Sequence, residues 1–69
     1  SVAEAVYLGD RIFMFSPGPG RLAKTIMITP DMVGKEPGLD PLTVQEGPKF
    51  KAFLKEVTQD FLKIEGAQG

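Results

Sequence analysis

The segment that most constrains the fold is RIFMFS, residues 11–16, because it places bulky apolar side chains at four successive positions, 12–15. Such residues favour a β-strand, in which successive side chains point to opposite faces. The strand is therefore apolar on both faces, and strands of this kind are normally covered on both faces. One short helix covers one face at most, so we expect a second covering layer from outside this strand's immediate neighbours.

A second strand is predicted to return antiparallel to the first. The sequence SPGPG, residues 16–20, must reverse the chain, and RLAKTIMIT, residues 21–29, is rich in strand-forming residues. Pro19 presets the first corner of a turn, and Gly20 tolerates a positive φ at the second. We therefore predict a hairpin with a type II turn that spans Gly18 to Arg21.

The first eight residues, SVAEAVYL, are predicted to form a short helix. Ser1 followed by Glu4 has the spacing of a capping box, and Gly9 suits a left-handed residue after the helix. The apolar stripe of this helix is expected to consist of Val2, Ala5, Val6 and Leu8. With the chain beginning on helix-like residues and without an initiating Met, we expect a piece of a larger protein.

The clearest helix is predicted over residues 48–66, PKFKAFLKEVTQDFLKIEG. Its apolar residues follow helical spacing, with Ile64 near the same stripe: Phe50, Phe53, Leu54, Val57, Phe61 and Leu62. Pro48 suits the first turn, and Gly66 suits the end. The Pro- and Gly-rich residues 30–48 are expected to be an irregular connection. The fold class is therefore α+β, in the order α-β-β-α, as one domain over residues 1–69.

Size and composition exclude several functions. With 69 residues, the chain buries only about 60% of its unfolded surface. It has no Cys and no His, which removes thiolate sites, disulfides and the commonest general base. The net charge of −1, with scattered basic residues, argues against nucleic-acid binding. Glu4 and Asp10 interrupt any signal-peptide pattern, and the absence of Cys fits the cytoplasmic protein that we expect.

One stretch is similar in sequence to a phosphate-binding loop. In the Walker A pattern, G-x-x-x-x-G-K-[ST], Gly18 aligns with the first Gly, and Lys24 and Thr25 with the last two residues. The sequence departs from this pattern in two respects, however. Ala23 stands where a Gly normally allows close approach to phosphate, and IMITP then follows as strand material where a helix should begin. We therefore interpret residues 16–25 as a hairpin turn with Lys24 exposed.

No catalytic, cofactor-binding or metal-binding residue can be assigned within this chain. Acidic residues that could pair for acid–base chemistry have no spacing that requires it, so we expect solvated acids and helix caps: Glu4, Asp10, Asp31, Glu36, Asp40 and Glu46. The aromatic residues Phe50, Phe53 and Phe61 lie at helical spacing and are expected in the core rather than in a ligand site.

The stretch EAVYLGDRIFMFSPGPGRL, residues 4–22, carries a more specific pattern. It resembles the segment after the switch histidine in ABC-transporter ATP-binding subunits of the nitrate/sulfonate/taurine/bicarbonate importer type. Those proteins have E-A-x-x-L-[AG]-D-R-[IV], an apolar strand, and S-x-x-P-G-R-[IL]. The matching residues are Glu4, Ala5, Leu8, Gly9, Asp10, Arg11, Ile12, Ser16, Pro19, Gly20, Arg21 and Leu22. The resemblance covers the first third of the chain.

The resemblance implies a structural role in a larger ATPase. In the family, the phosphate loop, signature motif, catalytic acidic strand and switch histidine all precede this segment, so none of their roles transfers to this chain. What transfers is Asp10 and Arg11 as a helix-to-strand junction and Pro19 to Arg21 as a hairpin tip. The implied intact parent would bind ATP and Mg²⁺, pair with a second ATPase subunit, and act on a membrane permease subunit at the inner membrane.

Two hypotheses therefore stand. In the first, the chain is the C-terminal part of such an ATP-binding subunit and does not itself hydrolyse ATP. In the second, it is a stand-alone small interaction or dimerisation module. In both, the two-faced strand at residues 12–15 lacks a covering layer, so we expect self-association, most simply as a homodimer.

Overall fold

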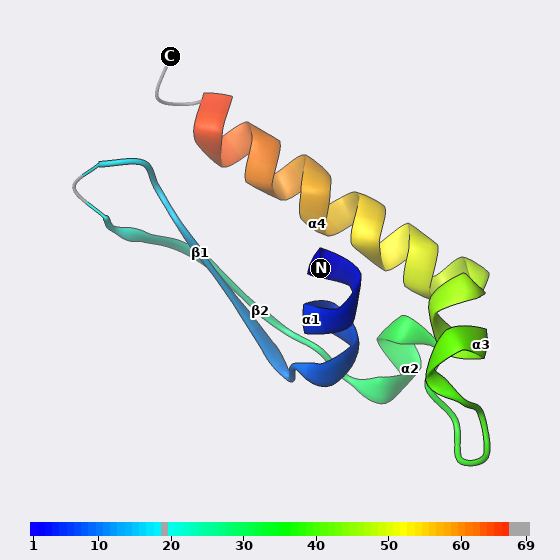
Figure 1. Ribbon diagram of the computed structural model, residues 1–69. Coiled ribbons are helices and arrows are strands. Elements are labelled where there is room, and N and C mark those ends of the chain that lie inside the picture. The colour runs from blue at the N-terminus through cyan, green and yellow to red at the C-terminus, as the bar shows by residue number, and fades with distance from the viewer. Residues whose placement is uncertain (19, 67–69) are drawn as a thin grey trace.

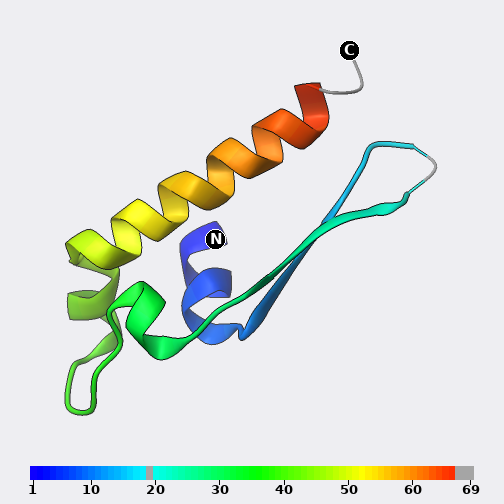
Figure 2. The same cartoon turned by 180° about the vertical axis from the view of Figure 1, so that it is seen from behind.

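The computed structural model describes residues 1–18 and 20–66. Its elements, in chain order, are α1 (Val2–Leu8), β1 (Arg11–Phe15), β2 (Leu22–Met27), α2 (Pro30–Val33), α3 (Pro41–Glu46) and α4 (Pro48–Gly66). The predicted α+β class, the two-stranded antiparallel hairpin and the C-terminal helix are confirmed. Figure 1 and Figure 2 show α4 running along the hairpin, with α1 between them near the hairpin base.

The hairpin register places Ile12 opposite Ile26 and Phe13 opposite Thr25, and shifts by one residue between Met14 and Phe15. The Ser16 amide closes the hairpin by donating to the Arg21 carbonyl at 2.8 Å. Gly20 has the expected positive φ, at 65°. Pro19 lies outside the described residues, so the predicted turn type stays a prediction. The second strand ends at Met27, two residues before the predicted end at 29.

The short helix α1 begins as predicted, because the Ser1 hydroxyl accepts a hydrogen bond from the Glu4 amide at 3.3 Å. The expected left-handed Gly9 is wrong, since this residue is extended, with φ −84° and ψ 163°. Glycine is needed there for space: a Cβ would lie 2.9 Å from the Ala5 carbonyl oxygen. The tight exit from α1, rather than a positive φ, explains the residue.

The predicted apolar stripe of α1 is confirmed at Val6 and wrong at Val2, Ala5 and Leu8. Val6 is buried, but Val2 and Leu8 remain 64% and 80% exposed. The helix instead turns Ala3 and Tyr7 toward the core beside Val6. This spacing of three and four residues is one helical face. A helix of two turns carries too few residues for its pattern to fix its buried face, so packing against neighbouring elements decides it.

The prediction of an irregular connection over residues 30–48 is wrong in part, because this connection contains two short helices. Pro30 opens α2, and the left-handed Gly34, at φ 79°, ends it. Pro41 opens α3, where the Asp40 side chain accepts from the Thr43 amide at 2.8 Å. Proline is favoured at the first helical position, because that position needs no amide donor and its φ is already helical.

The core draws on every helix and on β1. Its buried residues are Val6, Met14, Val33, Val44, Phe50, Phe53 and Val57. The first half of α4 supplies three of these residues, and Phe50 is only 1% exposed. In its second half the predicted apolar stripe emerges from the core, because Phe61 and Leu62 are 46% and 59% exposed. The core therefore lies at one end of an elongated molecule, whose extents are 43 × 19 × 17 Å.

Candidate interaction surface

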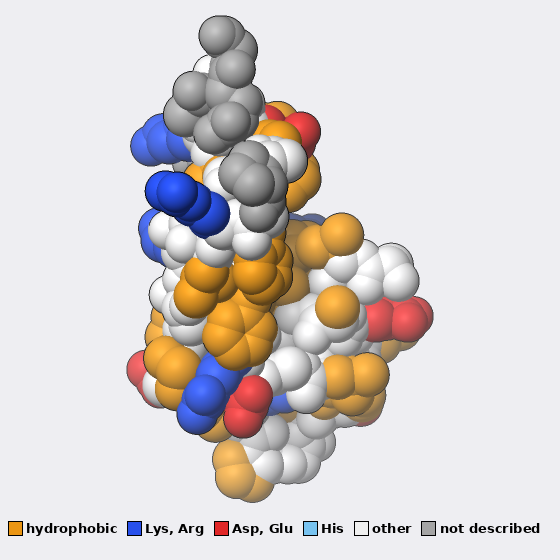
Figure 3. Space-filling view, turned by 90° about the vertical axis from the view of Figure 1, so that its left-hand side faces the viewer, with side chains coloured by type: hydrophobic (Ala, Val, Ile, Leu, Met, Phe, Trp, Pro, Cys, Tyr) orange, Lys and Arg blue, Asp and Glu red, His pale blue; other side chains and the backbone are white. Residues whose placement is uncertain are grey.

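The hairpin buries one face and exposes the other. On β1, Met14 is buried and Ile12 is half-buried, whereas Phe13 and Phe15 are 54% and 57% exposed. Cross-strand pairing places Leu22 opposite Phe15, and Leu22 and Met27 are each 55% exposed. We call these four exposed apolar residues the outer face: Phe13, Phe15, Leu22 and Met27. Figure 3 shows hydrophobic side chains gathered on the side of the molecule that carries the hairpin tip.

A groove of about 560 Å³ lies between β1 and the helices. Its walls are residues 12–15 of β1, Val2 of α1, and Val57, Thr58 and Phe61 of α4. Successive residues of β1 point to alternate faces, yet all four line the groove, so it follows the edge of this strand that is turned away from β2. We call it the β1-edge groove. Its lining is almost entirely apolar.

The covered face of the hairpin is tied to α4 by an ion pair. The Lys24 ammonium lies 2.6 Å from the Asp60 carboxylate, and the side chains are 46% and 27% exposed. A pair this open contributes at most about 1 kcal/mol. Lys24 and Thr25 both lie within β2, so no helix N-terminus follows them. The stretch whose sequence is similar to Walker A therefore forms one side of a hairpin. Its lysine makes an ion pair between β2 and α4.

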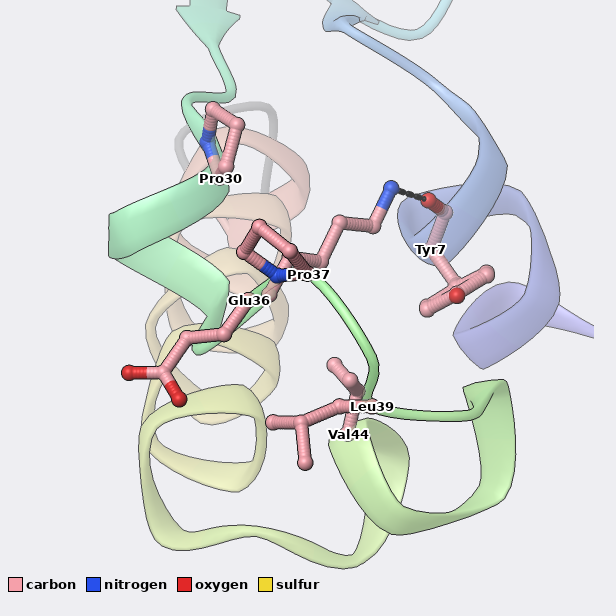
Figure 4. A pocket seen from close by; sticks show the side chains of 7 residues that line it. Tyr7, Pro30, Glu36, Pro37, Leu39 and Val44 are labelled. Carbon is pink, nitrogen blue, oxygen red and sulfur yellow. Dashed lines mark hydrogen bonds between the residues drawn. The ribbon is translucent and has the colours of Figure 1, made fainter.

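A smaller pocket of about 250 Å³ lies beside α1 and α3 and is shown in Figure 4. Lys35 is the cation in its wall. The Lys35 ammonium donates to the Tyr7 carbonyl and lies 4.3 Å from the centre of the Tyr7 ring. The labelled Glu36 side chain points away from this contact in Figure 4. Lys35 therefore links the segment after α2 to α1 through its contacts with Tyr7.

The acidic residues weighed as possible acid–base groups do not come together. All are exposed: Glu4, Asp10, Asp31, Glu36, Asp40 and Glu46. Asp40 caps α3, and the hydrogen bond from the Thr43 amide lowers the pKa of its carboxyl group. Asp31 accepts from the Thr29 hydroxyl at 3.1 Å. In residues 1–18 and 20–66, no group of His, Cys, Asp and Glu could hold a metal ion.

No helix in the part of the chain that the structure describes is both long and apolar enough to cross a bilayer. Comparisons of the chain with protein-family models, with curated proteins and with solved structures found no match. The outer face and the β1-edge groove are therefore the features that the geometry itself offers for a function. The sequence predicted the two-faced strand, but not the contributions of Val2, Leu22, Met27 and Phe61 to the surface around it.

Proposed function

We propose that the chain is the C-terminal structural part of the ATP-binding subunit of an ABC importer for a small anion or related solute. The observation that carries this proposal is the outer face, where four large apolar side chains are about half exposed on a two-stranded hairpin. A hairpin of this kind is marginal alone and suits a segment that extends a larger sheet. The resemblance over residues 4–22 supplies the identity of that larger domain.

The local arrangement supports the same assignment. Asp10 lies between α1 and β1, Arg11 begins β1, and the Ser16 amide donates to the Arg21 carbonyl at the end of the hairpin. These are the positions that the resemblance assigns to a helix-to-strand junction and a hairpin tip. In the proposed parent, ATP and Mg²⁺ bind upstream of this segment, a second ATPase subunit and a membrane permease are the partners, and the protein is cytoplasmic and peripheral to the inner membrane.

The reading frame upstream of the Ser1 codon tests this proposal directly. We expect the source DNA to encode, in the same frame, a Walker A motif, a signature motif, an acidic catalytic strand and then a histidine shortly before Ser1. A stop codon followed by a start codon immediately upstream would overturn the proposal. So would an upstream frame that lacks these motifs.

A second candidate is a stand-alone interaction module, and one observation favours it. The chain has a core of its own, in which Val33 and Phe50 are 0% and 1% exposed and five elements contribute buried residues. A segment that depended wholly on a larger domain would not require such a core. A cooperative unfolding transition of the isolated chain, together with an upstream stop codon, would favour this candidate.

A further inference from the structure

We infer that the β1 edge is a docking site for a second copy of this chain, with two β1 strands antiparallel about a two-fold axis at Phe13. The inference concerns the 69-residue chain itself and does not rest on the proposed place in a transporter. It rests on the backbone groups at this edge, the difference between the two strand edges, and the charge pattern of β1.

The alternation of hydrogen-bonded and non-hydrogen-bonded residues along β1 shows which of its backbone groups point away from β2. The Ile28 amide donates to the Asp10 carbonyl at 2.9 Å, in the same register as the pair Ile12 and Ile26. In an antiparallel ladder, residues that exchange hydrogen bonds with the partner strand alternate with residues that do not. The backbone amides and carbonyls of Asp10, Ile12 and Met14 therefore face β2. The amides and carbonyls of the residues between them, Arg11 and Phe13, are directed outward at the β1 edge.

The two edges of the hairpin differ in how well they accept a further strand. The register shift places an extra residue in β2, between Leu22 and Lys24, and Lys24 is charged. Bulges and lysines are features that protect sheet edges from pairing with other chains. In β1 the strand has no bulge and carries its one charge, Arg11, only at its end, and its partners over residues 11–14 follow one another without a break. The β1 edge is therefore the one open to a new strand.

The charge pattern of β1 selects a second copy in antiparallel orientation. Arg11 is the one charged residue of the strand and stands at its end. A two-fold axis at Phe13 places Phe13 opposite its own copy and Arg11 opposite Phe15 of the other chain. The two Arg11 side chains then lie at opposite ends, and each guanidinium meets an aromatic ring, which is a favourable contact. A parallel pairing would put the two arginines side by side.

The β1-edge groove explains what the pairing would bury. A two-fold axis perpendicular to the sheet keeps both α4 helices on one face, so the two grooves meet across the axis. Val2 and Phe61, which are 64% and 46% exposed, line that groove and would be covered in part there, whereas Phe13 would contact its own copy on the outer face. Each half-exposed Phe offers about 100 Å². The apolar area is thus below the roughly 800 Å² per partner of a standard interface, and we expect a weak, concentration-dependent dimer.

A single introduced cysteine tests this geometry, because the chain has none of its own. Opposed hydrogen-bonded residues have Cα atoms about 5.5 Å apart, within the range that a disulfide spans. We expect Phe13→Cys to form a disulfide-linked dimer under mild oxidation. The matched control is Thr25→Cys, at the position that pairs with Phe13 on β2. In the proposed dimer its copies lie about 14 Å apart, three strand spacings, so no cross-link is expected.

Sedimentation equilibrium of the unmodified chain is the companion measurement. We expect the apparent mass to rise from 7.5 kDa toward twice that value as concentration increases. Equal cross-linking of the two cysteine variants, or a mass that stays at the monomer value throughout, would overturn the inference. If Phe13→Cys loses its far-UV circular dichroism and so does not fold, a mixture of Arg11→Cys and Phe15→Cys tests the same pairing. The two variants should cross-link to each other faster than either does to itself, and equal rates would also overturn it.

Discussion

At the scale of single residues, the hairpin tip depends on Gly20. Its φ of 65° is a conformation that residues with a Cβ rarely adopt. We predict that Gly20→Ala lowers the free energy of unfolding by about 1 kcal/mol, as measured by urea denaturation. Gly18→Ala is the control, because a Cβ there meets no atom within 4 Å and its φ lies outside the strained range. Equal stability of the two variants would contradict this account of Gly20.

Asp40 links the stability of α3 to pH. The hydrogen bond from the Thr43 amide lowers the folded-state pKa of Asp40 below the usual value of an aspartate. The ionised cap therefore stabilises the fold at pH values above the unfolded pKa, and this contribution is lost as pH falls through the folded pKa. We predict that Asp40→Asn, which caps a helix about as well, removes this component. Unfolding free energies measured from pH 6 down to about 2 should then show a steeper decline in the wild type than in the variant.

At the scale of elements, α4 and the hairpin could be predicted from sequence because their patterns are long or bounded by turn residues. The helices α2 and α3 were missed although each has a helix-start signal, Thr29-Pro30 and Asp40-Pro41. The density of Pro and Gly over residues 30–48 indicates an irregular connection, but proline at the first helical position begins a helix. Helices of four and six residues have too few turns for periodicity to reveal them.

The candidate surface was predictable only in part, for a related reason. Apolar residues at four successive positions of β1 show that both faces need cover, and one face is indeed left open. The β1-edge groove joins Val2 to Phe61, which are distant in sequence, so only the packing of α1 between hairpin and α4 brings them together. The register shift at Met14 and Phe15 leaves no clear sequence signal, since Ala23 is an ordinary strand residue.

The strand character of β2 leads to a prediction about nucleotides. A phosphate loop works because its lysine and hydroxyl residue open a helix whose amides face the phosphates. Lys24 lies in a strand and is held by Asp60 at 2.6 Å. We predict that Mg-ATP, titrated into the isolated chain, produces no saturable amide shifts over residues 18–25. A Lys24→Ala variant should give the same titration. Saturable shifts there that vanish in this variant would contradict the hairpin interpretation.

At the scale of the whole molecule, a small core supports an extended hairpin and half of a long helix. Below about 70–80 residues, a single core rarely supplies more than about 3–5 kcal/mol. The outer face and the second half of α4 leave large apolar side chains in water, so their burial contributes little until another surface covers them. The fold of the isolated chain therefore depends on the cluster around Phe50, at the junction of α2, α3 and α4.

This dependence can be measured with two substitutions in the same helix. Phe50 is 1% exposed, and replacement of a buried Phe by Ala costs about 3–5 kcal/mol, which equals the whole expected stability. We predict that Phe50→Ala abolishes the cooperative urea transition followed by far-UV circular dichroism at low concentration. Leu62→Ala, at a position that is 59% exposed, should change the unfolding free energy by no more than about 0.5 kcal/mol. A transition that survives Phe50→Ala unchanged would mean that this core does not hold the chain together. Because the stand-alone module requires a core of its own, the absence of a cooperative transition in the unmodified chain is the result that would favour a segment stabilised by a larger partner domain.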